Sequence, residues 1–443
     1  MYKTRILPVP DPDSLGRFRP STSTSPAASS LDHWDAAESA PGLDALVIAA
    51  DHIRNTDVPV GFPTETVYGL GADATRSSAV RGIYSVKGRP SDNPLIVHVC
   101  DLDMLRQVCN AELPAIYRPL VERFWPGPLT ILLPVPATAK YTLAPEVTAG
   151  LPTFGARLPA SPLTRTLIRL ADAPLAGPSA NASTRPSPTT AQHVVDDLDG
   201  RIEVVLDGGA CGVGVESTVV DGLCDPPVIL RPGGISEADL RTVPGWEKVG
   251  RAYHDVKHGG NAPKDGAAQE AEGALKPRAP GMKYKHYSPK ARVVLYEGGK
   301  TPALSQEALV RDIEGAGRQA AVVGVVRTST WPALASTLQK TDGAGAALNG
   351  SVGGAASSAS SAAHNTNGLV YHLETYSIPD GPKVLELDLG RDLSSIAHGL
   401  FSALRDLDAH GAEVILMEGI DDGGDDMASA VMNRLRKAAS EVR

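Results

Sequence analysis

Short apolar runs alternate with longer amphipathic stretches through the first half of the chain. In one such stretch, Ala79, Val80, Ile83 and Tyr84 fall on one face of a helix. The runs between the stretches have the length of strands: VPVGF (58–62), LIVHV (95–99), LTILLPV (129–135), EVVLD (203–207) and STVVDG (217–222). This alternation predicts an α/β or α+β domain over residues 43–250.

The second half of the chain changes character. Residues 251–289 are polar, rich in Gly, Ala and Pro, and without periodicity, which predicts a linker. SSIAHGLFSALRDLDAHG is an amphipathic helix that ends at Gly411, and ASAVMNRLRKAASEV closes the chain as a helix. Strand-like runs accompany them: RVVLY (292–296), AAVVGVV (320–326), KVLELDL (383–389) and VILMEG (414–419). The pattern predicts a smaller βα domain over residues 290–443 with parallel strands.

Two low-complexity stretches interrupt this organisation. Residues 1–42 combine a short strand-like arm with the Ser-rich loop STSTSPAASS (21–30). Residues 342–368 are Gly/Ala/Ser repeats, which predicts a disordered insertion without chemistry of its own.

Composition narrows the classes to which the protein can belong. The 443 residues are 42% apolar, which excludes a wholly disordered chain. A formal net charge of −9 argues against binding nucleic acid by overall basicity and leaves a local basic pocket open. Since no apolar run reaches 18 residues and no apolar leader opens the chain, we expect neither a membrane-spanning helix nor a secretory signal.

The cysteines indicate the compartment. The chain has four, none in a CxxC pair: Cys100, Cys109, Cys211 and Cys224. Four in a chain of this length predict reduced thiols in a cytoplasmic protein rather than a disulfide framework. The N-terminal arginines and Ser/Thr run faintly resemble a transit peptide, but Asp11 and Asp13 argue against one.

Residues 63–99, PTETVYGLGADATRSSAVRGIYSVKGRPSDNPLIVHV, hold the densest group of candidate chemistry. Lys87 and Arg89 flank Gly88 at a predicted helix end, and Asn93 lies in the Pro-rich turn that follows. A guanidinium fork and an ammonium charge on one constrained turn suit a polyphosphate. Taken alone, the segment favours a structural interpretation, since cations at a helix C-terminus also complement its dipole.

Six segments place polar groups in otherwise neutral runs, and such groups also have ordinary structural explanations. His98 lies in an apolar strand, where a histidine is usually a satisfied core residue. The loop GPSANASTRPSPT (177–189) can cradle phosphate or ribose. The remaining candidates are Thr130 after the WPGP turn, Arg157 in GARLP, Ser179, Asn181 and Ser187 in the 177–189 loop, Ser217 in GVESTVVD, and Arg231 in ILRPGG.

Several well-known signatures are missing from the sequence. It has no GxxxxGK[ST], no GxGxxG after a strand and no HExxH or Cys/His metal spacing. GPSAN is not GxSxG, and neither a His nor an Asp can be assigned to it, so a hydrolase triad is rejected. The inventory favours a reaction driven by binding and charge neutralisation over covalent catalysis.

Together, PTETVYGLG, KGRPSDNPL, WPGPLT, PSAN, EST and RPG, in this order, resemble the YrdC-like threonylcarbamoyl-AMP synthase family over about residues 43–246. KYKHYSP and the tail ending in AVMNRLRKAA resemble its longer, two-domain form. The resemblance implies an α/β fold: a twisted open sheet with helices and a concave pocket, plus a smaller C-terminal Rossmann-like α/β domain. It also implies a nucleotidyltransferase that makes L-threonylcarbamoyladenylate from L-threonine, bicarbonate or CO2 and ATP. Diphosphate is released, and the product serves threonylcarbamoyladenosine formation next to the anticodon of tRNA.

The resemblance also assigns site residues, motif by motif. It places L-threonine on Thr64, His98, Arg157 and Ser217. It places ATP on Lys87, Arg89, Asn93, Thr130, Ser179, Asn181, Ser187 and Arg231. Lys87 and Arg89 would act on the phosphates together with Mg2+ that accompanies ATP, and no protein side chain is expected to bind a metal by itself. In the longer form the linker folds back over the pocket, which would bring Tyr287 of KHYSP onto the nucleotide.

Two interpretations other than the synthase stay open, and the expected partners follow from the synthase interpretation. A related enzyme could form a carbamoyl adenylate from carbamoyl phosphate, and a non-catalytic RNA-binding module is the alternative from another class. The net charge and the lack of aromatic stacking motifs weigh against the second. For the synthase, a separate threonylcarbamoyl transferase would receive the product, and tRNA would meet the pocket face.

Overall fold

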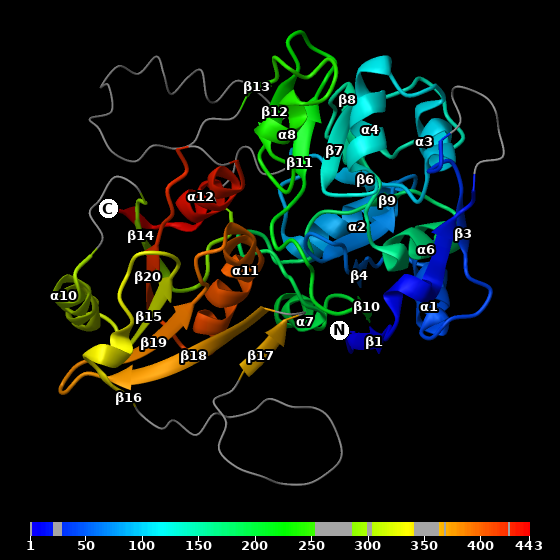
Figure 1. Cartoon of the computed structure of the whole chain (residues 1–443). Coiled ribbons are helices and arrows are strands. Elements are labelled where there is room, and N and C mark those ends of the chain that lie inside the picture. The colour runs from blue at the N-terminus through cyan, green and yellow to red at the C-terminus, as the bar shows by residue number, and fades with distance from the viewer. Residues whose placement is uncertain are drawn as a thin grey trace. The chain divides into compact units, whose positions relative to one another are not determined.

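The computed structural model describes residues 2–20, 29–252, 286–298, 304–340, 363–366, 369–423 and 426–443. The chain divides into two compact units, Met1–His286 and Tyr287–Arg443 (Figure 1). Both units are α/β, as the sequence predicts. Residues 253–285 of the predicted linker and most of the predicted insertion lie outside the described residues.

In its described part, the first unit forms one 11-stranded sheet of mixed direction. The order across the sheet is β1 (Arg5–Pro8), β10 (Val204–Asp207), β4 (Val60–Phe62), β5 (Gly69–Asp73), β9 (Leu175–Ala176), β6 (Ile96–His98), β8 (Thr153–Arg157), β7 (Leu129–Pro134), β11 (Thr218–Asp221), β12 (Val228–Arg231) and β13 (Gly250–Arg251). The pair that matters most below is β6 with β8, which run parallel and place His98 opposite Arg157.

Helices connect these strands and bury one face each. They are α1 (Leu43–Asn55), α2 (Ser77–Lys87), α3 (Leu102–Cys109), α4 (Arg118–Phe124), α5 (Pro145–Thr148), α6 (Pro162–Ala171), α7 (Ala191–Leu198) and α8 (Glu237–Arg241), with 3-10 turns η1 (Pro12–Leu15) and η2 (Ala115–Tyr117). The predicted face of α2 is buried, and α2 ends where Gly88 adopts φ +61°, as its sequence indicates. Its N-cap is Arg76 rather than a serine, and Ser78 donates to Asp57 instead.

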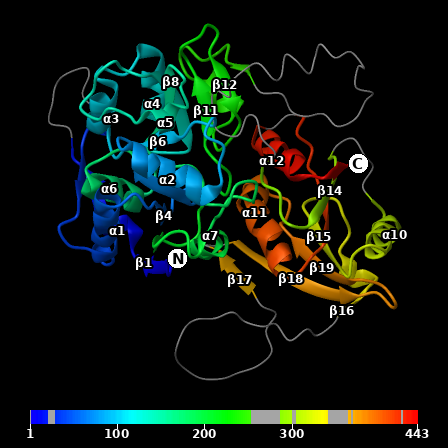
Figure 2. The ribbon, with the colours of Figure 1, turned by 180° about the vertical axis from the view of Figure 1, so that it is seen from behind.

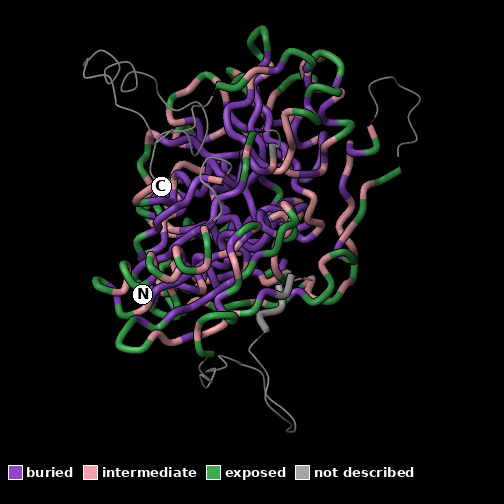
Figure 3. Tube along the Cα trace, turned by 60° about the vertical axis from the view of Figure 1, so that its left-hand side comes forward, coloured by how far each residue is buried: buried purple, intermediate pink, exposed green. Residues whose placement is uncertain are grey.

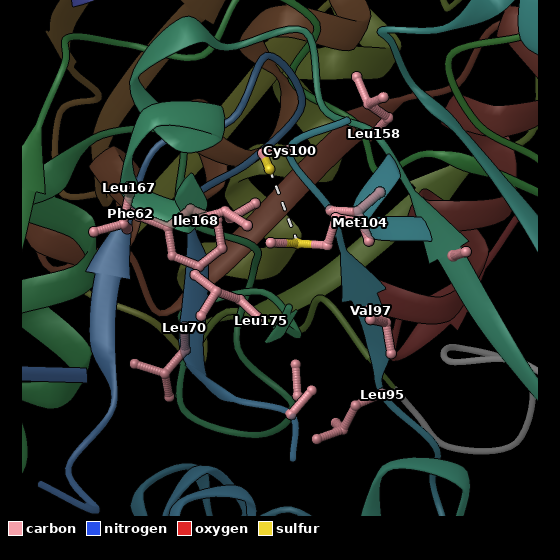
Figure 4. Packing of buried hydrophobic residues seen from close by; sticks show 14 of the residues in the cluster. Phe62, Leu70, Leu95, Val97, Cys100, Met104, Leu158, Leu167, Ile168 and Leu175 are labelled. Atoms are coloured by element: carbon pink, nitrogen blue, oxygen red, sulfur yellow. Dashed lines mark hydrogen bonds between the residues drawn. The ribbon is translucent and has the colours of Figure 1, made fainter. Parts of the chain in front are cut away.

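The core of the first unit lies against these strands, where Phe62, Leu70, Ile168 and Leu175 meet (Figure 4). A Cβ on Gly69 would lie 2.5 Å from the Phe62 ring, and one on Gly71 would lie 2.6 Å from it. The glycines of YGLG therefore let β5 pack directly on Phe62 of β4. Figure 3 shows buried residues along the strands and exposed residues in the connecting loops.

The N-terminal segment is part of this fold. β1 pairs in parallel with β10, in register from Arg5 with Val204 to Pro8 with Asp207. β2 (Gly16–Phe18) and β3 (Trp34–Ala36) form a separate antiparallel pair. The Arg165 guanidinium lies 4.1 Å from the Trp34 ring centre, and burial lowers the pKa of Arg165 to about 10.

The second unit has a mostly parallel sheet in its described part. The order is β16 (Gln339–Lys340), β18 (Leu369–Ser377), β19 (Lys383–Asp388), β15 (Val322–Arg327), β20 (Val414–Glu418), β14 (Arg292–Tyr296) and β21 (Glu441–Val442), with β17 (Ala363–Thr366) paired to β18. From β19 to β21 the neighbours are parallel, as predicted. β17 falls within the stretch predicted as a disordered insertion.

Helices cover both faces of this second sheet. α10 (Gln306–Gly317) lies on one face, and α11 (Leu393–Ala409) and α12 (Asp426–Ala438) lie on the other (Figures 1 and 2); a 3-10 turn, η3 (Leu334–Ser336), follows β15. The closing helix is shorter than its sequence indicates. It ends at Ala438, since Glu441 and Val442 pair with β14 as a strand.

Candidate functional site

The PTET loop after β4 meets the end of β8. Thr64 Oγ1 lies 2.8 Å from Thr66 Oγ1 and donates to the Val67 carbonyl at 2.7 Å. Arg157 Nη2 donates to Thr66 Oγ1 at 3.0 Å and to Glu65 Oε1 at 2.6 Å. The structure therefore brings Thr64 and Arg157, both predicted to hold L-threonine, into one hydrogen-bonded group.

His98 lies beside this group, because β6 places it opposite Arg157. Its side chain is buried, and its Nδ1 has no hydrogen-bond partner among the described residues. Burial, and then the charge of Arg157, lower the pKa of His98 to about 3. A neutral imidazole with an unused ring nitrogen is a polar atom that a ligand can satisfy.

The chain after β9 packs closely against the ring of His98. A Cβ on Gly177 would lie 3.0 Å from His98 Nδ1. Gly177 also bonds through its own N–H to the Ile96 carbonyl at 2.9 Å. The first residue of GPSAN thus packs against the ring and restricts its position.

The TILL, EST and RPG motifs form a second group. Thr130 Oγ1 lies 2.8 Å from Ser217 Oγ. Arg231 donates through Nε at 3.1 Å and Nη2 at 2.9 Å to the Ser217 carbonyl. A Cβ on Gly233 would lie 2.3 Å from the Glu216 carbonyl oxygen, so RPGG crosses EST backbone against backbone.

Ser187 ties the 177–189 loop to the same group. Its hydroxyl donates to Glu216 Oε1 at 2.6 Å, and both residues are buried. The carboxylate of Glu216 therefore bonds Ser187, which the sequence assigns to ATP, and Glu216 directly precedes Ser217, which it assigns to threonine.

Lys87 joins helix α2 to that loop. Its Nζ donates to the carbonyl oxygens of Ser179 and Asn181. Ser179 Oγ donates to Asn181 Oδ1 at 2.5 Å, and the Asn181 amide donates to Ala182 and Arg185 carbonyls at 2.8 and 3.0 Å. Because a backbone carbonyl is a neutral acceptor, these bonds fix the ammonium group without cancelling its charge.

Arg89 and Asn93 lie in the turn after α2. Arg89 donates through Nε to the Asn93 carbonyl at 3.3 Å and through Nη2 to the Pro94 carbonyl at 3.1 Å. Asn93 is 2% exposed, and its Oδ1 has no partner among the described residues. Lys87 and Arg89 thus occupy one helix end, as predicted, but bond to different carbonyls.

Tyr287 is placed elsewhere, in the second unit. Its ring stacks on Phe401 with ring centres 5.2 Å apart, and the Arg434 guanidinium lies 6.0 Å from its centre. The contact of Tyr287 with the nucleotide stays a prediction.

Two carboxylates of the site, Glu65 and Glu216, are not among the residues predicted from the sequence. Both were within quoted motifs, PTET and EST. An acidic side chain contributes no attraction to anionic substrates, and its local sequence gives no sign of its partner. Arg157 is 92 positions from Glu65 along the chain, so only the fold reveals that pair.

Comparisons with known proteins agree with this picture. Residues 53–233 match the Sua5/YciO/YrdC family model described as "Telomere recombination". Residues 235–440 match the model described as "Threonylcarbamoyl-AMP synthase, C-terminal domain". The two matches together span both units.

Similar proteins extend over nearly the whole chain. The threonylcarbamoyl-AMP synthase of Schizosaccharomyces pombe is 42% identical over 90% of this chain and 89% of its own length. That of Bacillus subtilis is 39% identical over 88% of this chain and 92% of its own. The crystal structure of Pyrococcus abyssi Sua5 complexed with L-threonine matches at a TM-score of 0.64 and 34% identity, covering 90% of this chain and 95% of that one.

Proposed function

The chain belongs to the threonylcarbamoyl-AMP synthase family in its two-domain form, and from this premise we propose which of its residues carry the reaction. As an enzyme of this family it makes L-threonylcarbamoyladenylate from L-threonine, bicarbonate or CO2 and ATP for the modification of tRNA. One observation carries the residue assignment: six separated motifs form a hydrogen-bonded cluster in which buried His98 Nδ1 and Asn93 Oδ1 have no partner among the described residues.

The reaction needs binding and charge neutralisation more than a protein nucleophile. The amine of threonine either adds to CO2 with loss of a proton or condenses with bicarbonate with loss of water, and both routes give N-carboxy-threonine. One oxygen of that new carboxylate attacks the α-phosphorus of ATP, and the bond to diphosphate breaks. Since all the reactants are anionic, the enzyme has to offset their mutual repulsion.

We infer that threonine lies against the first group of residues and against Ser217 of the second group. Arg157 binds its carboxylate, and Thr64 and Ser217 bond its other polar groups. His98 stays neutral because its pKa is about 3, so it serves as a hydrogen-bond donor or acceptor and not as a charge. A site that bonds the substrate hydroxyl rejects analogues lacking it, because its own buried groups would then be left unpaired.

ATP lies against Thr130 and Arg231 of the second group, the 177–189 loop and the turn after α2. Lys87, Arg89 and Arg231 neutralise the phosphates and act on the transferring phosphorus. Bonds to backbone carbonyls orient all three cations. The remaining contacts to the nucleotide come from Asn93, Thr130, Ser179, Asn181, Ser187 and, from the second unit, Tyr287.

We expect Mg2+ to arrive as its complex with ATP. The Glu216 carboxylate and Ser187 hydroxyl offer the oxygen ligands that Mg2+ prefers. In the part of the chain that the structure describes, no three His, Cys, Asp or Glu side chains form a metal site by themselves. When bound, the ion would supply further charge neutralisation on the phosphates.

The proposal extends to partners and location. A separate transferase would take the threonylcarbamoyl group from the product to tRNA, and tRNA would approach the face that holds the nucleotide. We propose a cytoplasmic location, in keeping with four free cysteines. Among the described helices, none has the length and apolar character needed to cross a bilayer.

The test is diphosphate release from ATP by the full chain in bicarbonate, with L-threonine, L-serine, carbamoyl phosphate or no addition. We expect release that depends on threonine, with threonylcarbamoyl-AMP identified by its mass. Release driven by carbamoyl phosphate would instead support a carbamoyl adenylate enzyme. Salt-dependent tRNA binding without ATP consumption would support a binding module.

A further inference from the structure

Glu65 has contacts that its place in an anion-binding loop does not explain. Its side chain is 16% exposed and lies between Thr64 and Thr66 along the chain. Oε1 accepts from Arg157 Nη2 at 2.6 Å, and Oε2 accepts from the Ala160 N–H at 3.1 Å. Each carboxylate oxygen therefore has a defined partner, one on the substrate-binding arginine and one on the backbone just after β8.

The hydrogen bonds of Arg157 show what this contact does. Nη2 has two hydrogens, and both are taken, by Glu65 Oε1 and Thr66 Oγ1. Nε is directed at the Gly127 carbonyl at 3.3 Å. Nη1 has no hydrogen bond to the described residues. Nε and Nη2 of the guanidinium are thus occupied, and only Nη1 is left to bind a ligand.

We propose that Glu65 is a positioning residue for threonine: it holds Arg157 so that Nη1 alone meets the substrate carboxylate. This inference rests on the proposed function of Arg157. A fork held on Nη2 cannot bind a carboxylate through two parallel bonds with Nη1 and Nη2. The substrate is then oriented by one charged bond to Nη1 and by the neighbouring Thr64 and His98.

The Glu65 charge has a second consequence. An ion pair with side chains 5% and 16% exposed brings no net charge into this part of the site. Such a pair suits an amino acid that itself enters with one positive and one negative group. An unpaired arginine would attract any small anion, including phosphate and bicarbonate, to the place where threonine must lie.

The test compares full-chain Glu65→Ala and Glu65→Gln with wild type. Diphosphate release is measured against threonine at saturating ATP, and against ATP at saturating threonine. We expect Glu65→Ala to raise the KM for threonine about tenfold or more and to change the KM for ATP less than about twofold. Glu65→Gln keeps an oxygen for Arg157 Nη2, so its threonine KM should rise less.

A matched control and a double variant separate positioning from structure. Glu237 also holds an arginine at 2.6 Å with a 12% exposed side chain, but on α8, and Glu237→Ala should leave both KM values unchanged. If Glu65 acts through Arg157, Arg157→Ala combined with Glu65→Ala should bind threonine no worse than Arg157→Ala alone.

Three outcomes would overturn the inference. Equal losses for threonine and ATP would show a merely structural role. Tighter threonine binding by Glu65→Gln would show that Glu65 competes with the substrate for Arg157. Unchanged threonine affinity of both variants, measured by calorimetric titration, would remove the role while leaving the proposed function intact. A wild type that neither binds nor uses threonine would overturn both.

Discussion

Each unit holds a glutamate with hydrogen-bond donors, but with opposite results: Glu65 of the first unit is partly exposed, and Glu418 of the second is buried. In the first unit, Glu65 accepts a hydrogen bond from Arg157 Nη2. Arg157 Nη1 and His98 Nδ1 have no partner among the described residues. In the second unit, Glu418 at the end of β20 accepts from the backbone N–H groups of Thr328 at 2.7 Å, Ser329 at 3.1 Å, Thr330 and Trp331 at 2.9 Å, and from the Thr330 hydroxyl at 2.7 Å.

The position of Glu418 makes the comparison informative. After β15 the chain continues on the side of the sheet where β19 lies, whereas after β20 it continues on the side where β14 and β21 lie. The neighbouring strands β15 and β20 therefore form the switch point of the sheet. Open parallel sheets usually bind ligands in the crevice at that point. Here the donors of the 328–331 turn are taken by the protein's own carboxylate. At this switch point of the second unit the donors are occupied by Glu418, whereas in the first unit His98 Nδ1 and Asn93 Oδ1 have no partner among the described residues.

The largest effect should come from Gly233→Ala, which disrupts the packing of backbone against backbone in the first unit. The new Cβ would lie 2.3 Å from backbone atoms of Glu216 and Thr218, so RPGG and EST must separate. We expect diphosphate release to fall by about 100-fold or more, since Arg231 and Ser217 are displaced together. Gly212→Ala is the control, because no atom lies within 4 Å of its added Cβ. Activity within a few-fold of wild type would contradict the proposed assembly of the site.

Substitutions of single cations in the first unit should affect the use of ATP and the use of threonine separately. Lys87→Ala should lower kcat/KM for ATP by about 100-fold, because it removes a charge from the phosphates. Arg157→Ala should mainly raise the KM for threonine, by about tenfold to 100-fold. Arg81→Ala, an exposed cation on the same helix as Lys87, should change neither value. If both variants affect ATP and threonine alike, the two groups of residues do not correspond to two substrates.

Glu418→Ala should destabilise the second unit without changing substrate use. Removing the acceptor leaves two buried and two partly buried N–H groups unpaired, so we expect the free energy of unfolding to fall by about 2–3 kcal/mol in urea titrations. Added sulfate should stabilise this variant more than wild type, because the emptied turn can take an anion. Glu413→Ala, which loses one exposed bond to the Ala321 N–H, is the control. Altered KM values would show that the second unit shapes the active site.

The same variant has a defined pH dependence. Burial acts to raise the pKa of Glu418, but the hydrogen bonds from residues 328–331 outweigh it, and the pKa lies below the ordinary value. A lowered folded pKa stabilises the protein above the unfolded pKa, and this stabilisation is lost as the pH falls through the folded pKa. The stability difference between wild type and Glu418→Ala should therefore be full at pH 7 and shrink below about pH 4.5. A difference that is constant down to pH 3 would show that the charge is immaterial.

The smallest effect concerns His98 in the first region. Because its pKa is about 3, the imidazole is neutral from pH 6 to 8, and the threonine KM should vary less than about twofold across that range. The unfolded chain, by contrast, binds a proton at this histidine below about pH 6.5, so its contribution to stability falls as the pH drops from 6.5 towards 3. An inflection of the threonine KM near pH 6.5 that disappears in His98→Asn would show that the ring titrates in the working range.

Local features of the fold could be predicted from the sequence, and long-range ones could not. The end of α2 at Gly88 and the placement of Lys87 depend on neighbouring residues, and the prediction was confirmed. The closing helix was predicted through Val442, but pairing with β14 converts its last residues into β21. The Glu65–Arg157 bond and the filled turn at Glu418 join residues about 90 positions apart, and nothing in either local sequence indicates the partner.

The parallel pairing of β1 with β10 bears on how the protein is made. Arg5 finds its partner at Val204, so the edge of the first sheet closes only after about 200 residues have left the ribosome. Until then, β10's neighbour β4, which leads into the PTET loop, lacks the two strands on that side. β1 is thus synthesised about 200 residues before the strand with which it pairs. A chain shortened by its first eight residues would end its folding with the hydrogen-bonding groups of β10 exposed at a bare sheet edge.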